Sequence, residues 1–235
     1  MIVGRDPRTY KRARFPAWPG QGTYRTMDFA AARKVMVDSQ VRVNDVTDRG
    51  LQAALLGVPR ERFCAADRAF AAYGEVEVEI AGDRRLMRAR EVAKLLQALD
   101  ARPGETALAI AAPYAAAVLA DLGLKVTAQE ADPAVAEVVA PALDDAGVVM
   151  HVGPLTTPTG ADWDLIVSEG AVAARPTAWL EKLRIGGRLA VVERNGPNGR
   201  AVLYVRGREG YSRRELFDAA PPVLAEMTPA PAFAL

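Results

Sequence analysis

The stretch that most constrains the fold lies between residues 107 and 131, near the middle of the chain. An apolar run (107–112) is followed by an Ala-rich segment (113–122), and a second strand-like run (124–130) ends on the acid Glu130. A strand, a tight turn, a helix and a second strand fit within this length, as a βαβ unit requires. The pattern predicts two parallel strands joined by a helix.

The turn between the first strand and this helix is where a nucleoside ligand would bind. In dinucleotide and S-adenosylmethionine sites of doubly wound sheets, the turn cradles the ligand, and an acid ending the second strand binds the ribose hydroxyls. Glu130 stands at the position of that acid. The turn carries Ala111, Ala112 and Pro113 where such loops carry glycines, and alanine is disfavoured at positive φ. Taken alone, residues 111–114 fit a plain turn better than a ligand loop.

Composition predicts a soluble, cytoplasmic α/β protein. Half of the 235 residues are hydrophobic and the net charge is only +1, so nothing global indicates binding to nucleic acid or membranes. The lone cysteine, Cys64, excludes an internal disulfide, and we interpret it as a packing residue rather than a reactive thiol. The lone histidine, His151, excludes a multi-histidine metal site, and we expect no metal. No apolar run reaches the ~20 residues of a membrane span, and no signal peptide is visible.

The first 26 residues form a basic extension, with six Lys or Arg against one Asp. Such an arm could bind RNA, DNA or an acidic surface. We favour a disordered tail, or a start codon assigned too early, because Met27 opens the first helical pattern. The remaining chain divides into an N-terminal helical and hairpin part (27–100), a core (101–220) and a Pro/Ala-rich tail expected to fray (221–235).

The N-terminal part is predicted to hold helices over 27–41 and 45–56, followed by a half-buried edge strand over 74–80. The glutamates of that strand are interpreted as a solvated face rather than a metal site. Gly82 and Asp83 make a turn before a helix that ends near Leu99. The arginines in between could hold an anionic ligand, although a solvated helix start is the simpler interpretation: Arg84, Arg85, Arg88 and Arg90.

The second half of the chain alternates strands with helices. Asp132 and Pro133 predict a helix start, and another helix is expected at 176–183. Ser212 with Glu215 resembles a capping box and predicts a last helix. Strands are expected at 147–152, 161–168, 188–192 and 201–205, the last two antiparallel.

Three of the strand ends then fall at one edge of a parallel sheet, where ligands of such sheets bind. They carry Glu130, Gly153 and the polar run 168–170. This agreement is better evidence for a site than any single end.

Several phrases together resemble the protein-L-isoaspartate O-methyltransferase family, in the order that this family uses. The resemblance covers nearly all of the chain from Met27 to about Gly207. The phrases are MVDSQVR (36–42), VPRERF (58–63), AYGEVEVEI (72–80), the βαβ stretch, DWDLIVSEGAV (162–172) and LEKLRIGGRLAVV (180–192).

This resemblance implies a Rossmann-like methyltransferase sheet with helices on both faces, mostly parallel with a C-terminal antiparallel hairpin. It implies S-adenosylmethionine as methyl donor and proteins or peptides with isomerised aspartyl (isoaspartyl) residues as substrates, in a repair reaction. The alternative is an inactive methyltransferase fold that serves as a binding or scaffold module. A third hypothesis makes the basic extension a nucleic-acid adaptor.

The resemblance also assigns a set of site residues. It places cofactor contacts at the first loop, at the ribose acid and its neighbour, at the adenine-side turn and at the fourth strand end, and substrate contacts before a helix; it assigns no catalytic residue. The cofactor residues are Ala109, Ala111, Ala112, Tyr114, Glu130, Ala131, Gly153, Pro154, Leu155 and Ser168, and the substrate residues are Met87 and Arg88.

The chain departs from the family at these working positions. The first loop is shortened and lacks glycine, and Ala109 replaces the usual acid. The adenine-side turn, usually Gly, Asp, Gly, is Gly153, Pro154 and Leu155 here. Met87 replaces a serine of the active site, and methionine has no hydroxyl to donate. These changes predict weaker cofactor binding, and they motivate the inactive alternative.

Overall fold

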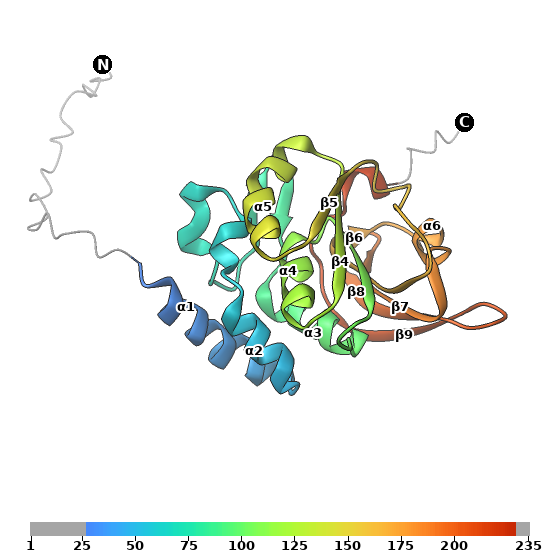
Figure 1. Ribbon diagram of the computed structural model, residues 1–235, viewed down its shortest axis with the longest axis horizontal. Helices are drawn as coiled ribbons and strands as arrows, with labels where there is room; N and C mark the ends of the chain where they lie inside the picture. Colours follow the sequence, from blue (N-terminus) through green and yellow to red (C-terminus); the bar gives the residue numbers. More distant parts are fainter. Residues whose placement is uncertain (1–26, 229–235) are drawn as a thin grey trace, which may run out of the picture.

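The computed structural model describes residues 27–228 and contains a seven-stranded sheet. Helices flank this sheet (Figure 1). The strand order is β5-β4-β3-β6-β7-β8-β9. The first five of these strands are mutually parallel, β8 is antiparallel to β7, and β9 is antiparallel to β8. A separate two-stranded antiparallel sheet, β1-β2, precedes the main sheet in the chain. The predicted fold class is confirmed.

The strands are β1 (Val78–Ala81), β2 (Arg84–Leu86), β3 (Thr106–Ile110), β4 (Lys125–Glu130), β5 (Val149–Val152), β6 (Trp163–Val172), β7 (Leu183–Arg194), β8 (Gly199–Arg206) and β9 (Tyr211–Asp218). The α-helices are α1 (Phe29–Met36), α2 (Arg49–Gly57), α3 (Ala89–Leu99), α4 (Pro113–Asp121), α5 (Pro133–Asp145) and α6 (Thr177–Leu180). A π-helical turn, η1 (Val37–Val41), continues α1, and short 3-10 turns follow it: η2 (Arg42–Asn44), η3 (Arg60–Phe63), η4 (Ala66–Ala71) and η5 (Ala225–Met227).

Each face of the sheet has its own hydrophobic core, because successive side chains of a strand point to opposite sides. Along β3, Ala107 and Ala109 face the core shared with α3, α4 and α5, whereas Leu108 and Ile110 face the core that contains Trp179 of α6. Small alanines on the helical side let α4 lie close to the strands. Both faces are thus covered, although α6 is a single turn.

Local sequence signals explain the helices that flank the parallel strands. Asp132 caps α5 by accepting a hydrogen bond from the Ala134 N–H at 2.8 Å, and Pro133 occupies the first turn, as predicted. Pro113 plays the same part in α4. The βαβ unit of β3, α4 and β4 is therefore confirmed, with Glu130 as the last residue of β4.

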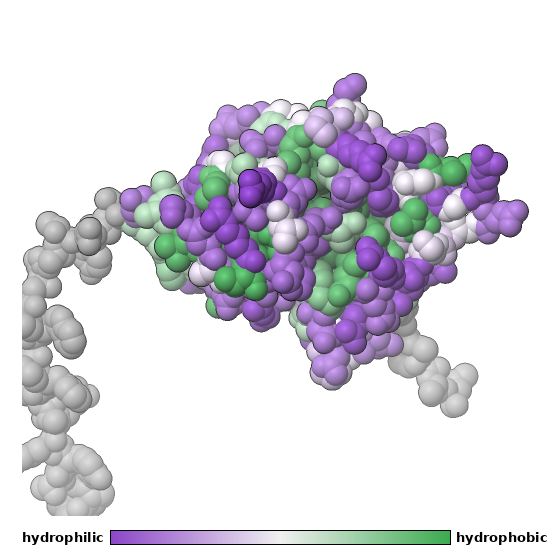
Figure 2. Space-filling model, turned by 90° about the horizontal axis from the view of Figure 1, so that it is seen from below, coloured by the Kyte–Doolittle hydropathy of each residue, from purple (hydrophilic) through white to green (hydrophobic). Residues whose placement is uncertain are grey.

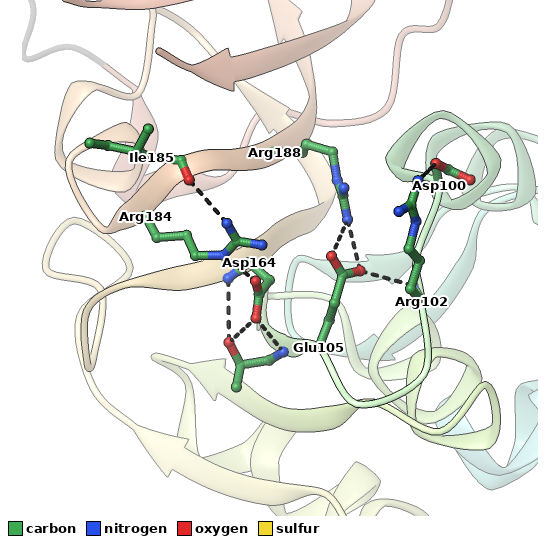
Figure 3. A network of polar contacts seen from close by, with 8 residues as sticks. Asp100, Arg102, Glu105, Asp164, Arg184, Ile185 and Arg188 are labelled. Carbon is green, nitrogen blue, oxygen red and sulfur yellow. Dashed lines mark hydrogen bonds and ion pairs between the residues drawn. The ribbon is translucent and has the colours of Figure 1, made fainter. Parts of the chain in front are cut away.

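A network of ion pairs ties the amino ends of the central strands together, at the edge opposite the predicted site (Figure 3). Glu105 accepts hydrogen bonds from Arg188 at 2.8 Å, joining the start of β3 to β7. Asp164 on β6 accepts from the Thr106 N–H and hydroxyl, both at 2.8 Å, and pairs with Arg184. These charged groups pair with one another, so the network links the amino ends of β3, β6 and β7.

One predicted helix is wrong. Ser212 and Glu215 do not begin a helix, because residues 211–218 form β9, which pairs with the whole length of β8. A strand edge supplies hydrogen-bond partners that a local capping pattern cannot reveal.

Other predicted boundaries shift. The alternating strand is shorter than 74–80, since β1 begins at Val78 and Val76 is exposed. β6 runs on to Val172, past the predicted end at Ser168. The helix expected at 176–183 shrinks to the four residues of α6.

Residues 219–228 form a C-terminal strap that lies against the carboxyl end of β6, so this part of the predicted frayed tail is docked. Ala171 and Val223 form a parallel bridge, and the Leu224 N–H donates to the Ala171 carbonyl at 2.8 Å. Gly170 permits this contact, because a Cβ there would lie 2.6 Å from Leu224. The basic extension (1–26) and residues 229–235 lie outside the described residues.

Along residues 27–228, no helix combines the length and the apolar character that crossing a membrane requires. On the face shown in Figure 2, hydrophobic residues form patches that hydrophilic residues interrupt. The large hydrophobic side chains that are most exposed are scattered over several elements, among them Val35, Val43, Phe70 and Val149.

Candidate cofactor site

The predicted strand ends meet at the carboxyl edge of the sheet. Ile110, the last residue of β3, is paired with Gln129 of β4 on one side and with Ser168 of β6 on the other. Glu130 is paired with Val152, the residue before Gly153. The structure therefore brings together the end of β3, the predicted ribose acid, the predicted adenine-side turn and Ser168, which lies within β6 rather than at its end.

Glu130 is buried and fully engaged by the protein itself. Its carboxylate accepts two hydrogen bonds from Arg84, at 3.0 Å from Nε and 2.7 Å from Nη2. The backbone N–H groups of Ala131 and Asp132 donate to the same carboxylate at 2.8 and 3.2 Å. The Arg84 and Glu130 side chains are only 9% and 4% exposed, so water does not screen this ion pair.

The first loop is packed into the interior. Ala109, Ala111, Ala112 and Tyr114 are all buried, and Ala111 adopts a φ of 49°, in the region that favours glycine. The Ala111 N–H donates to the Gln129 carbonyl at 2.8 Å, which holds the strained residue in place. At Ala111 the loop therefore adopts a backbone conformation that favours glycine, although the residue carries a methyl group.

The side chain of Tyr114, at the start of α4, is completely buried in the core. Its ring packs edge-on against Phe63 at 5.8 Å between centroids, and the Arg60 guanidinium lies 4.7 Å from the ring centre. Arg60 is itself completely buried and donates to the carbonyls of Ala72 and Met87. The aromatic ring is part of the core.

A buried carboxylate that the sequence did not single out as a site residue, Glu169, caps the amino end of α4. It accepts a hydrogen bond from the Ala115 N–H at 2.7 Å. Burial raises the pKa of Glu169 to about 6, an effect that the charge of Arg60 and the backbone N–H of Ala115 partly offset. Among the described residues, the buried side-chain atoms without a hydrogen-bond partner include Glu169 Oε2, Ser168 Oγ and Tyr114 Oη.

The adenine-side turn is held by the C-terminal strap. Leu155 is buried; its N–H donates to Glu226 Oε2 at 2.9 Å, and its carbonyl accepts from Trp179 Nε1 at 2.7 Å. Gln129 donates to the Pro154 carbonyl at 2.7 Å. Gly153 continues the ladder by donating to the Glu130 carbonyl at 2.9 Å.

The two predicted substrate residues lie in different surroundings. The side chain of Met87 is buried, whereas Arg88 is partly exposed at the start of α3 and pairs with Glu91 at 3.5 Å. Arg90 pairs with Glu75 at 3.6 Å, and Arg85 is exposed. The arginines of 84–90 do not converge on one anion, because each faces a different part of the molecule.

The site in this conformation does not fit S-adenosylmethionine. The cavity beside Arg84, which Met87, Glu169 and Leu224 also line, has a volume of only about 20 Å³, and neither Glu130 nor the first loop nor the adenine-side turn lines it. The ribose acid, the amino end of α4 and the adenine-side turn are each occupied by side chains of this chain. Among residues 27–228 there is also no group of three His, Cys, Asp or Glu placed to hold a metal.

The architecture defines the class of protein. A parallel β5-β4-β3-β6-β7 arrangement, a βαβ unit ending in an acid and an antiparallel C-terminal hairpin are the Rossmann-like fold of S-adenosylmethionine-dependent methyltransferases. The profile of the protein-L-isoaspartate (D-aspartate) O-methyltransferase family matches residues 32–215. The chain belongs to this family, as its sequence resemblance predicts.

Curated relatives carry the same family name. The chain is 34% identical over 197 residues to the protein-L-isoaspartate O-methyltransferase of Methylorubrum populi, covering 81% of this chain and 92% of the relative. It is 32% identical over 196 residues to the Methylorubrum extorquens protein of that name, covering 80% and 86%.

Solved structures agree on the fold. A protein-L-isoaspartate O-methyltransferase superposes with a TM-score of 0.70 at 17% identity, covering 82% of this chain and 66% of that one. A Plasmodium falciparum protein of this type, in complex with S-adenosyl-L-homocysteine, also gives 0.70, at 13% identity, covering 86% and 100%.

Sequence reasoning missed the residues that occupy the site. The preferred interpretation of the arginines at 84–90, a solvated helix start, is wrong for Arg84, which lies buried in β2 and binds the carboxylate of Glu130. Glu169 was visible only as part of the polar run that follows the fourth strand. Nothing in the local sequence pointed to Glu226, which reaches Leu155 across 71 residues.

Proposed function

We propose that this protein is an S-adenosylmethionine-dependent carboxyl methyltransferase that acts on isoaspartyl residues of proteins or peptides, in the cytoplasm. The observation that carries the proposal is family membership over residues 32–215, which includes the whole sheet except the end of β9. In this family the methyl donor is S-adenosylmethionine and the acceptor is a protein carboxylate. The comparisons offer nothing that favours the inactive scaffold.

Methyl transfer to a carboxylate requires little of the protein beyond the alignment of methyl donor and acceptor. A carboxylate acceptor is already ionised near neutral pH, so methyl transfer to it needs no strong base. The replacement of a serine by Met87 therefore does not remove an obligatory proton acceptor. The chain's own contributions are the buried acid Glu130 and the rigid edge formed by β3, β4 and β6.

The test is transfer of a labelled methyl group from S-adenosylmethionine to an isoaspartyl peptide. The matched acceptor control is the same peptide with a normal aspartyl residue. We expect base-labile label only in the isoaspartyl peptide, with a low rate for the reason given in the next subsection. Glu130→Ala should remove the activity, whereas Glu137→Ala, an exposed acid on α5, should retain it.

Absence of transfer, in the wild type and in the Arg84→Met variant described below, would overturn the proposal. Transfer to the aspartyl peptide at an equal rate would reject the isoaspartyl substrate and leave a carboxyl methyltransferase of another specificity.

A further inference from the structure

The ion pair between Arg84 and Glu130 lies at the carboxyl edge of the main sheet. It is bidentate and buried, and it joins residues 46 positions apart in the chain. Arg84 belongs to β2, in the small β1-β2 sheet, while Glu130 ends the second strand of the main sheet's βαβ unit. The pair therefore fastens one sheet to the site of the other.

A ribose cannot share Glu130 with Arg84. One carboxylate oxygen accepts from Arg84 Nη2 and from two backbone N–H groups, and the other accepts from Arg84 Nε. The guanidinium is a fixed, fully charged fork that matches the two carboxylate oxygens, whereas ribose hydroxyls are neutral donors. A ribose diol would have to displace the guanidinium, and it would do so with weaker donors.

The part of the chain that carries Arg84 shares no strand pairing with the main sheet, although its buried side chains pack into the core beside α5 and β6. Strands β1 and β2 have four and three residues and pair only with each other. Their turn contains Gly82 at a φ of 56°, and both Gly82 and Asp83 are exposed. Displacing Arg84 would also enlarge the cavity of about 20 Å³ that it lines.

We propose that Arg84 is an autoinhibitory latch. Its guanidinium occupies the carboxylate of Glu130, the predicted ribose acid, and a nucleoside cofactor binds only when Arg84 has released that carboxylate. The inference rests on the proposed function, since it concerns the same site. It makes the structure described here the closed form of the enzyme.

The test compares the affinity of Arg84 variants for S-adenosylhomocysteine by titration calorimetry. Arg84→Met removes the charge and every hydrogen bond to Glu130 while keeping a long side chain. We expect it to bind about tenfold more tightly than the wild type or better, because one lost charged contact corresponds to at least a decade of affinity. The matched control is Arg102→Met, an exposed arginine at the opposite edge, which should leave the affinity unchanged (Figure 3).

A second variant covers the case in which Arg84→Met does not fold, a point that circular dichroism decides. Arg84→Lys keeps the charge but loses the two-pronged geometry, so it should bind more tightly than the wild type, by a smaller factor. If Arg84→Met is unstable, affinity of Arg84→Lys equal to that of the wild type would overturn the latch.

The remaining outcomes separate the latch from the proposed function. Equal, measurable affinity in the wild type and Arg84→Met overturns the latch and leaves the function intact. No binding by either folded protein overturns the latch, and the absence of methyl transfer by both then removes the function as well. Tighter binding by Arg84→Met without methyl transfer supports the latch and rejects the assigned reaction.

Discussion

Glu169 makes the stability of this protein depend on pH in an unusual direction. Its carboxyl group is completely buried, and its pKa is raised from 4.5 to about 6 by that burial. Because each pKa unit corresponds to about 1.4 kcal/mol, ionising Glu169 costs about 2 kcal/mol more in the folded protein than in the unfolded chain. The folded state therefore binds this proton more tightly than the unfolded state does.

The direction in which stability changes with pH follows from this tighter proton binding by the folded state. Between pH 4.5 and about 6 the folded protein holds more protons at Glu169 than the unfolded chain, so its stability falls as the pH rises. Below pH 4.5 the contribution is fully present, and above about pH 6 it is lost. Acids with a lowered pKa, such as Asp164, act in the opposite sense. A difference between variants is needed to isolate Glu169.

Glu169→Gln keeps an acceptor for the Ala115 N–H and removes the charge. We expect the stability of this variant relative to the wild type to increase by about 2 kcal/mol from pH 4.5 to pH 7.5. The measurement is urea unfolding followed by circular dichroism at several pH values. Glu137→Gln, the same chemical change at an exposed position of α5, supplies the baseline.

A stability difference that stays constant within about 0.5 kcal/mol over this pH range would refute the reasoning, since it would mean that Glu169 is no harder to ionise in the folded protein.

Two further substitutions test how the sheet is held at its two edges. Asp164→Asn should destabilise the protein by about 1 to 2 kcal/mol at pH 7, because Asp164 accepts from Thr106 and pairs with Arg184. The carboxyl's pKa is lowered by hydrogen bonds from these partners, against the effect of burial, so the loss should disappear as the pH falls through that pKa in urea unfolding. Leu224→Ala should cost about 2 to 3 kcal/mol in the same assay, since this leucine is 4% exposed in the strap; a cost below about 0.5 kcal/mol would show that the strap does not contribute to the core.

The parts predicted correctly are those whose signals lie within a few residues. The run 107–130 combines apolar strands, a proline-started helix and a terminal acid, and all three depend on local periodicity and turn chemistry. The cap at Asp132 is equally local. The prediction at Ser212 failed because its capping box competed with a strand edge of β8 that lies earlier in the chain.

In the candidate site too, the sequence predicted the features that depend on local signals and not those that depend on distant residues. That Glu130, Gly153 and Ser168 lie at one edge follows from strand order alone, because parallel strands end together. What each group contacts does not follow, since a carboxylate is free or paired according to side chains that are far away in the sequence. The cofactor contacts assigned by resemblance remain predictions.

The sequence by itself determined the fold class, the family and the position of Glu130 at the end of its strand, since these depend on periodicity, turn residues and the order of phrases. Only the tertiary structure decided which groups Arg84, Glu169 and Glu226 contact at the edge where the cofactor is predicted to bind, across 46, 54 and 71 residues. The physical reason is that an ion pair or a cap depends on which groups share a small, water-free space. No local pattern in the chain specifies that space before the strands and the strap have packed.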